Sequence, residues 1–194
     1  MTSIISYYPI LLNLKGKKCV VVGGGKVAER KALSLLKSGA KITVISPECT
    51  VRLKKENLTG RIKYISRRYK NGDLKNAFLV IAATDAGETN RKISEDAPYL
   101  VNVVDMPLLC NFIVPSVVRR GPLTIAVSTS GVSPSLARTI KKELEGLYGR
   151  EFEEHLNYIK KIRVRSLAGI KNNKERTKFL RGLSLNAWKK LRSP

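Results

Sequence analysis

The sequence predicts an α/β fold in which helices cover both faces of a parallel sheet. Short, continuously apolar runs recur along the first two thirds of the chain, and segments with helical spacing separate them. Strands that are buried on both faces of a parallel sheet have this composition. Three consecutive glycines follow the first apolar run and open a helical pattern, which is the arrangement of a dinucleotide-binding turn.

Six apolar runs are expected to be strands, at residues 18–22, 42–45, 62–65, 78–83, 100–104 and 123–127. The first helix should follow the glycines, because Ala28, Ala32, Leu35 and Leu36 fall on one stripe. Gly39 is a suitable residue to end that helix.

The three glycines, Gly23, Gly24 and Gly25, form the most specific local motif. Read as G-x-G-x-x-A, the motif consists of Gly23, Gly25 and Ala28. The first glycine allows a tight turn, the second removes a side chain where backbone approaches a pyrophosphate, and Ala28 lets the helix pack closely. The N-terminus of the helix offers unpaired N–H groups to the phosphates. The alternative is an ordinary strand-to-helix turn in a protein that binds no nucleotide.

The pattern changes near residue 114, and three parts are expected: residues 1–113, 114–149 and 150–194. Residues 115–122 are interpreted as a short helix followed by a turn. Ser133 and Pro134 should begin a long helix that ends near Leu147, since apolar residues recur on one face between them. The last part is helical in composition and strongly basic.

The charge balance points to an anionic partner. The chain has 37 Lys and Arg against 15 Asp and Glu, a net charge of +22, and residues 160–194 hold 12 basic residues and one acid. Such a field attracts polyanions, either nucleic acid or a polycarboxylate metabolite, although it also fits a surface that is simply soluble.

Several classes of protein are disfavoured by composition. No apolar run approaches the roughly 20 residues that span a bilayer, so no membrane contact is expected, and the N-terminus lacks the pattern of a signal peptide. The three cysteines, Cys19, Cys49 and Cys110, have no metal-ligand spacing. This spacing predicts no metal site. The odd number of cysteines, with Cys19 in a predicted buried strand, predicts reduced thiols and a cytoplasmic location.

Polar residues follow the second and fourth predicted strands. Glu48 comes two residues after the strand-end Ser46 and is the candidate for a ribose hydroxyl, with an ordinary loop acid as the alternative. No basic pair follows this strand, which favours NAD over NADP, although Arg52 keeps the choice open. Small residues after the fourth strand allow a nicotinamide ribose to lie over it, and Asp85 is expected to cap the next helix.

Asp105 ends the fifth predicted strand, where a carboxylate lies beside any cofactor crevice and can act as a base. The alternative is that it only caps the chain reversal before Met106 and Pro107. The single histidine, His155, lies in a polar helical region and is interpreted as a solvated or packing residue.

These residues together resemble the siroheme synthase N-terminal family, the precorrin-2 dehydrogenases and sirohydrochlorin ferrochelatases. The resemblance covers about residues 5 to 150, and the spacing of its motifs is more specific than the glycine turn alone. In order, the motifs are Tyr8-Pro9-Ile10, residues 21–31, Gly39-Ala40, Thr43-Val44, Ala82-Ala83-Thr84-Asp85, Asn102-Val103-Val104-Asp105, Phe112-Ile113-Val114-Pro115 and residues 130–138.

The resemblance implies an NAD-dependent oxidation of precorrin-2 to sirohydrochlorin, and it leaves open whether ferrous iron (Fe²⁺) is then inserted to give siroheme. It implies a Rossmann-type NAD-binding domain at 1–113, a small dimerisation segment at 114–149 that makes a homodimer, and a basic helical C-terminal domain at 150–194. Asp105 matches the family's catalytic acid. The implied cofactor contacts are Gly23, Gly24, Gly25, Lys26, Val27, Pro47, Glu48, Ala83 and Thr84. The implied substrate contacts are Asn111, Ser128, Thr129 and Ser130, and Thr129 stands where a relative has a phosphorylatable serine.

An alternative from another class is an NAD-sensing regulatory module whose basic tail binds nucleic acid. Two observations disfavour this regulatory module, and with it a nucleic-acid partner. No helix-turn-helix pattern precedes the glycine turn, and a sensor has no need of the Asn-Val-Val-Asp and Ser-Gly-Val-Ser-Pro sequences.

Overall fold

The computed structural model describes residues 6–192, with side chains described up to residue 183. The chain divides into two compact units, Met1–Ile113 and Val114–Pro194. Among the described helices, none combines the length and the apolar character that a bilayer crossing requires.

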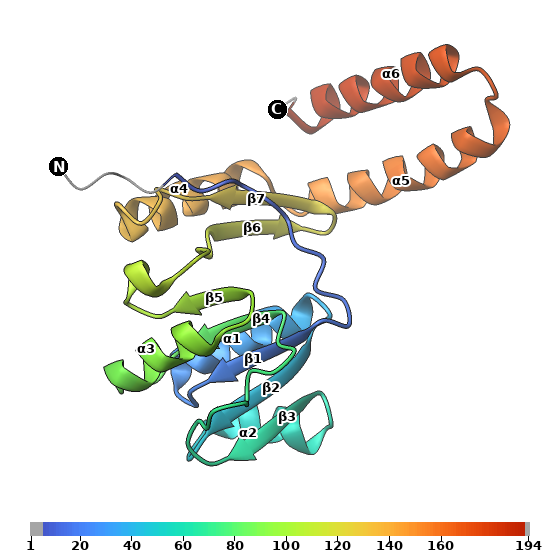
Figure 1. Ribbon diagram of the computed structural model, residues 1–194. Helices are drawn as coiled ribbons and strands as arrows, with labels where there is room; N and C mark the ends of the chain where they lie inside the picture. Colours follow the sequence, from blue (N-terminus) through green and yellow to red (C-terminus); the bar gives the residue numbers. More distant parts are fainter. Residues whose placement is uncertain (1–5, 193–194) are drawn as a thin grey trace. The chain divides into compact units, whose positions relative to one another are not determined.

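The first unit is built on a parallel five-stranded sheet (Figure 1). Its strands lie in the order β3-β2-β1-β4-β5, so the chain reverses direction across the sheet between β1 and β4. The strand bounds are β1 (Lys18–Val22), β2 (Lys41–Ser46), β3 (Ile62–Ser66), β4 (Leu79–Ala82) and β5 (Leu100–Val103). In open α/β sheets, ligands bind beyond the carboxyl ends of the strands at such a reversal.

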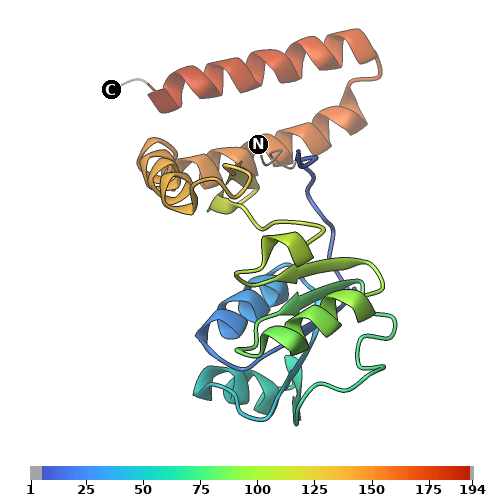
Figure 2. The same ribbon diagram turned by 60° about the vertical axis from the view of Figure 1, so that its left-hand side comes forward.

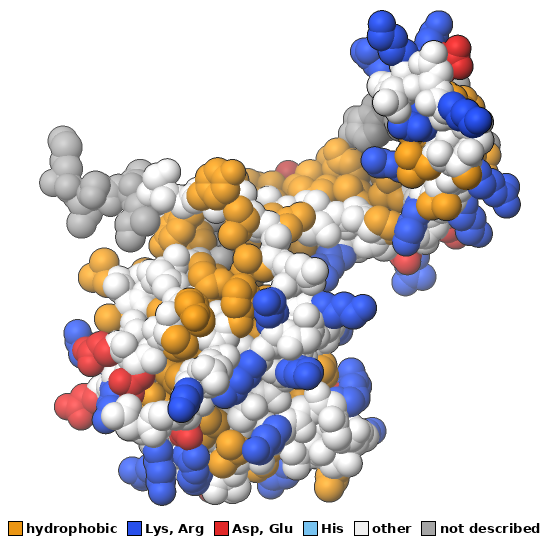
Figure 3. Space-filling model, turned by 45° about the vertical axis from the view of Figure 1, so that its right-hand side comes forward, with side chains coloured by type: hydrophobic (Ala, Val, Ile, Leu, Met, Phe, Trp, Pro, Cys, Tyr) orange, Lys and Arg blue, Asp and Glu red, His pale blue; other side chains and the backbone are white. Residues whose placement is uncertain are grey.

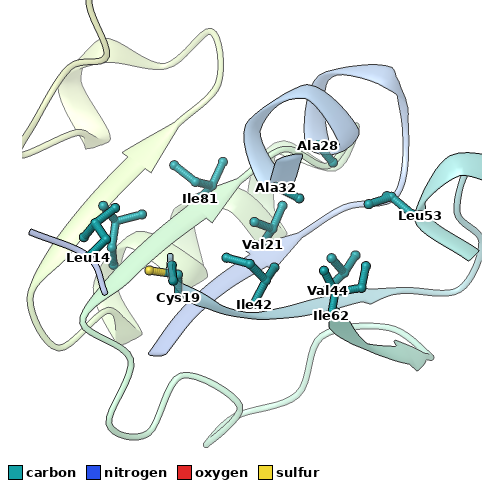
Figure 4. Close-up of a cluster of buried hydrophobic side chains, with 12 residues drawn as sticks. Leu14, Cys19, Val21, Ala28, Ala32, Ile42, Val44, Leu53, Ile62 and Ile81 are labelled. Atoms are coloured by element: carbon teal, nitrogen blue, oxygen red, sulfur yellow. The ribbon is translucent and has the colours of Figure 1, made fainter. Parts of the chain in front are cut away.

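Helices lie on the two faces of this sheet (Figure 2). Their bounds are α1 (Lys26–Lys37), α2 (Val51–Leu58), α3 (Gly87–Asp96) and the short 3₁₀ turn η1 (Pro107–Leu109). Alternate residues of β1 point to opposite faces. Cys19 and Val21 pack with Ala28, Ala32 and Leu53 of α1 and α2, as Figure 4 shows. The α/β fold class and the first five predicted strands are therefore confirmed.

The other face of the sheet is covered partly by irregular chain. Val20 and Val22 pack with Ile93 of α3 and with Leu74 and Ala77, which lie in the segment between β3 and β4. No helix forms in that segment, residues 67–78. Its apolar residues nevertheless close the core, and this places residues 68 and 69 near the carboxyl ends of the strands.

The described part of the second unit, residues 114–192, contains an antiparallel pair of strands and three helices. Its bounds are β6 (Ser116–Arg120), β7 (Leu123–Val127), α4 (Pro134–Leu147), α5 (Glu151–Gly169) and α6 (Asn173–Arg192). β6 pairs with β7, and Ser133 accepts a hydrogen bond from the Leu136 N–H at 3.3 Å to cap α4. The predicted long helix after Ser133 is therefore confirmed.

Of the short helix and the turn predicted at residues 115–122, the helix is wrong, because most of this segment is strand β6, and the turn forms at its end. Val117 and Val118 favour an extended backbone, and Gly121 adopts a positive φ of 55° that allows the chain to turn back into β7. The predicted sixth strand at 123–127 does form, but it pairs with β6 in a separate sheet.

Candidate active site

The glycine turn joins β1 to α1, and its three glycines have different roles. Gly23 has a φ of 121°, and a Cβ there would lie 2.1 Å from the Ala83 carbonyl oxygen. A Cβ on Gly24 would lie 1.9 Å from the carbonyl oxygen of Glu48. Both positions therefore need glycine so that the loops after β4 and β2 can pack against the turn.

Gly25 is different, because a Cβ there would meet nothing within 4 Å. It is the N-cap of α1 in an extended conformation, and no side chain caps this helix end. The first N–H groups of a helix have no partner inside the helix. The space in front of Gly25 is thus a cradle for an anion, and it fits the pyrophosphate of a dinucleotide.

A cavity of about 1180 Å³ opens at this point. Residues that follow β1, β2, β3, β4 and β5 line it, so it lies where the fold predicts a ligand. Every cofactor contact and the catalytic acid implied by the sequence line this one cavity: Gly23, Gly24, Gly25, Lys26, Val27, Pro47, Glu48, Ala83, Thr84 and Asp105.

Hydroxyl groups on β3 fix the loop that carries Glu48. The Tyr64 hydroxyl lies 2.9 Å from the Ser46 carbonyl oxygen and 3.1 Å from that of Pro47, and the Ser66 hydroxyl donates to the Pro47 oxygen at 3.0 Å. Burial raises the pKa of Tyr64 above its ordinary value, so the phenol remains a donor at neutral pH. The exposed Glu48 therefore stands on a fixed backbone at the edge of the cavity.

The loop after β4 is held by the buried side chain of Asn90. The Thr84 hydroxyl donates to Asn90 Oδ1 at 2.7 Å, and Asn90 Nδ2 donates to the Thr84 carbonyl oxygen at 2.9 Å. The expected N-cap role of Asp85 is wrong, because α3 has Ala86 at its N-cap and the Thr84 hydroxyl accepts the Ala86 N–H at 3.3 Å. Asp85 instead lines the cavity.

Asp105 follows β5 with a φ of 58° and is exposed at the cavity. Among residues 6–183, whose side chains the structure describes, none forms a hydrogen bond or ion pair with its carboxylate. Its left-handed backbone also suits the chain-reversal role, so the catalytic and the structural role both stay predictions. A carboxylate left free beside a cofactor crevice can accept a proton from a bound ligand.

The predicted substrate contacts do not line this cavity. The Asn111 side chain binds backbone, since its Oδ1 accepts the Val101 N–H at 2.8 Å and its Nδ2 donates to the Tyr99 oxygen at 2.6 Å. Ser128, Thr129 and Ser130 belong to the second unit, where the first two accept backbone N–H groups of their own loop. All four assignments stay predictions.

His155 lies near Tyr158, with ring centroids 6.2 Å apart, and its Nε2 is buried without a hydrogen-bond partner in the described part of the chain. Sequence reasoning did not assign several other residues of the cavity to the site, among them Arg68, Tyr69 and Asn90. The first two lie in irregular chain after β3, for which no local motif exists. Asn90 lies in the polar stretch after β4, which is a signal that could have found it.

Two family models match the chain, the first over most of the first unit and the second over a part of the second unit. The family model described as "Putative NAD(P)-binding" matches residues 10–116, and that described as "Sirohaem biosynthesis protein central" matches residues 120–147. The chain belongs to the siroheme synthase N-terminal family. The predicted resemblance is thereby confirmed, as is the nicotinamide dinucleotide cofactor that the sequence predicts.

Curated relatives carry the name siroheme synthase. That of Methylobacillus flagellatus is 47% identical over 149 residues, which are 73% of this chain and 32% of the relative. That of Nitrosospira multiformis is 43% identical over 157 residues, which are 75% of this chain and 33% of the relative. The chain thus spans about a third of the length of these relatives.

A solved structure resembles the chain over nearly its whole length. The structure of SirC, a precorrin-2 dehydrogenase, matches with a TM-score of 0.73 and 26% sequence identity, covering 94% of this chain and 100% of SirC. The names of these relatives are those of biosynthetic enzymes, and none of them favours the alternative of an NAD-sensing regulatory module.

Proposed function

We propose that this chain catalyses the NAD-dependent oxidation of precorrin-2 to sirohydrochlorin in siroheme biosynthesis. The observation that carries the proposal is the similarity to SirC, which extends over all of that precorrin-2 dehydrogenase. The cavity at the glycine turn supports it, because the cofactor residues and a free carboxylate line the same space.

The residues of the first unit have separate roles in binding the cofactor. The N-terminus of α1, beginning at Lys26 behind the open space at Gly25, holds the pyrophosphate. Glu48 accepts a hydrogen bond from the ribose of the adenosine half. Ala83 and Thr84 let the other ribose lie over the end of β4. NAD, when bound, supplies a hydride acceptor.

Asp105 acts as the general base in this proposal. Oxidation of the macrocycle removes two hydrogens, one as a hydride to the cofactor and one as a proton. The carboxylate of Asp105 accepts the proton. It is exposed at the cavity, and no described side chain forms a hydrogen bond or ion pair with it. General-base catalysis of this kind contributes about 10²–10⁴-fold to a rate.

The charge of the protein suits the substrate. Precorrin-2 carries eight carboxylates, and the chain has a net charge of +22. On the face shown in Figure 3, Lys and Arg side chains are spread widely and acidic side chains are few. Such a field raises the rate of encounter with a polyanion, and added salt weakens it.

Insertion of Fe²⁺ into sirohydrochlorin is a second candidate reaction, favoured by the name siroheme synthase on the relatives. Metallation also requires loss of pyrrole protons, and Asp105 is available to accept them. The proposal further includes a homodimer formed through residues 114–149, substrate contacts from Asn111, Ser128, Thr129 and Ser130, and a cytoplasmic location in which Cys19, Cys49 and Cys110 stay free thiols.

An anaerobic assay tests both reactions on one sample. Precorrin-2 and NAD are mixed with the protein, NADH formation is followed at the absorption band of its reduced ring, and Fe²⁺ is then added. NADH formation together with the spectrum of sirohydrochlorin supports the dehydrogenase. A protein that binds NAD but leaves precorrin-2 unchanged contradicts it, and a change on adding Fe²⁺ beyond that of a protein-free control supports the chelatase.

A further inference from the structure

Arg68 is a cation of the cavity that the proposed mechanism does not use. It follows β3, it is exposed, and it lines the same cavity as Glu48. In the part of the chain that the structure describes, its guanidinium forms no hydrogen bond or ion pair. Arg52, the basic residue that the sequence left open as a phosphate ligand, is instead paired with Glu56, its Nε lying 3.0 Å from Oε1.

The backbone of Arg68 is held on both sides. Arg67 binds Asp73 through two nitrogens, at 2.8 and 2.7 Å, and also donates to the Arg68 carbonyl oxygen at 3.0 Å. On the other side, the Tyr69 hydroxyl donates to Asp96 Oδ2 at 2.6 Å. The fork of Arg67 and the phenol of Tyr69 thus anchor the loop, so a ligand would have to order only the side chain of Arg68 and not its backbone.

Glu48 and Arg68 occupy equivalent places on adjacent strands. In the parallel pair β2 and β3, Ser46 is the partner of Ser66, so each charged residue lies two positions beyond a paired serine. Adjacent strands lie about 4.8 Å apart. Both residues follow adjacent strands and line the same cavity, and no ion pair joins them in the described residues.

We propose that Glu48 and Arg68 together set the choice between NAD and NADP at the adenosine ribose. The carboxylate of Glu48 accepts a hydrogen bond from the 2′-hydroxyl of the adenosine ribose in NAD, and its charge repels the 2′-phosphate of NADP. Arg68 is a latent ligand for that phosphate, because its planar guanidinium binds phosphate oxygens in pairs. The native protein thus prefers NAD through Glu48 and still binds NADP measurably through Arg68. This inference rests on the cofactor of the proposed function, and not on the tetrapyrrole.

Five proteins test it: the native chain, Glu48→Gln, Arg68→Ala, the double variant, and Lys70→Ala as a control. Lys70 is exposed in the same loop but does not line the cavity. Calorimetric titration with NAD and with NADP gives two dissociation constants for each protein, and a thermal midpoint shows that each is folded. Glu48→Gln should improve the ratio of NADP to NAD affinity at least tenfold, because it removes the repelling charge and keeps a hydrogen-bonding group.

The double variant decides the role of Arg68. The double variant should lose most of the improvement in the ratio of NADP to NAD affinity that Glu48→Gln shows. Arg68→Ala alone should weaken the affinity for NADP at least tenfold and change the affinity for NAD less than threefold. Lys70→Ala should change neither affinity more than twofold. A gain that persists in the double variant overturns the inference, as does an equal loss of NADP binding in Lys70→Ala, which indicates a general charge effect. A native chain that binds neither nucleotide overturns the proposed function as well.

Discussion

Replacing Gly25 by valine should abolish tight NAD binding and leave the fold intact. A Cβ at Gly25 meets nothing within 4 Å, and its φ of −76° is open to any residue. The cost to folding is therefore limited to the change of a helix N-cap, about 0.5–1 kcal/mol. For a chain of this size, that corresponds to a fall of roughly 1–4 °C in the melting temperature.

The same side chain fills the space in which the N-terminus of α1 meets the pyrophosphate. Losing even one charge-assisted hydrogen bond costs about 1.5–3 kcal/mol, which weakens NAD binding by roughly 10- to 150-fold. Gly23→Ala is the contrasting variant. Gly23 has a φ of 121°, and a Cβ at this position would lie 2.1 Å from the Ala83 carbonyl oxygen. The backbone of the variant must therefore move to relieve the clash. Gly23→Ala should lower the melting temperature by about 6 °C or more, since strain and displacement together exceed ~2 kcal/mol.

Calorimetric titration with NAD and a thermal melt on the same preparations separate the two glycines. We expect a folded Gly25→Val that binds NAD at least tenfold more weakly and a destabilised Gly23→Ala. Native NAD affinity in a folded Gly25→Val refutes the placement of the pyrophosphate. A loss of stability in Gly25→Val as large as that of Gly23→Ala refutes the distinction drawn between the two positions.

Three further outcomes are expected. Asp105→Ala should lower the rate of precorrin-2 oxidation per folded molecule by about 10²–10⁴-fold with NAD affinity nearly unchanged, and full activity in the folded variant contradicts the role of this base. Raising the salt concentration should reduce kcat/KM for the tetrapyrrole steeply and for NAD much less, whereas tight, sequence-selective DNA binding at physiological salt counts against this use of the charge. The guanidinium of Arg67 holds the pKa of Asp73 below its usual range, so their pair stabilises the fold at neutral pH and is lost as the pH falls through that lowered pKa. Asp73→Asn should therefore lower the melting temperature at pH 7, and the difference from the native chain should shrink as the pH falls below the ordinary range of an aspartate and vanish once Asp73 is protonated in the folded protein.

The sheet of the first unit was predictable from the sequence because each strand has a local signature. Runs such as residues 18–22 and 78–83 are continuously apolar, and the glycine turn marks where β1 ends. The helix predicted at 115–122 is wrong although a signal for the hairpin is present: Val117 and Val118 precede a Gly-Pro pair, and a second apolar run follows. The two arginines before that pair fit a short helix equally well, so local sequence alone does not separate the two structures.

The candidate site was predictable only where a residue belongs to a motif. The glycines, Glu48 and Asp105 directly follow strands, so topology alone brings them to one edge of the sheet. Arg68 and Tyr69 reach the cavity because an irregular segment packs Leu74 and Ala77 into the core. No short-range pattern reveals such a path, since it depends on contacts between residues far apart in sequence.

The backbone at Asp105 restricts which acid can serve there. A φ of 58° lies in the left-handed region, which side chains with a short polar group, Asp and Asn, enter far more readily than Glu. The chain therefore selects aspartate over glutamate by conformation before any chemistry is considered. For protein engineering, the acid at this position is not interchangeable: asparagine preserves the local geometry without the base, and glutamate preserves the base at the expense of the geometry.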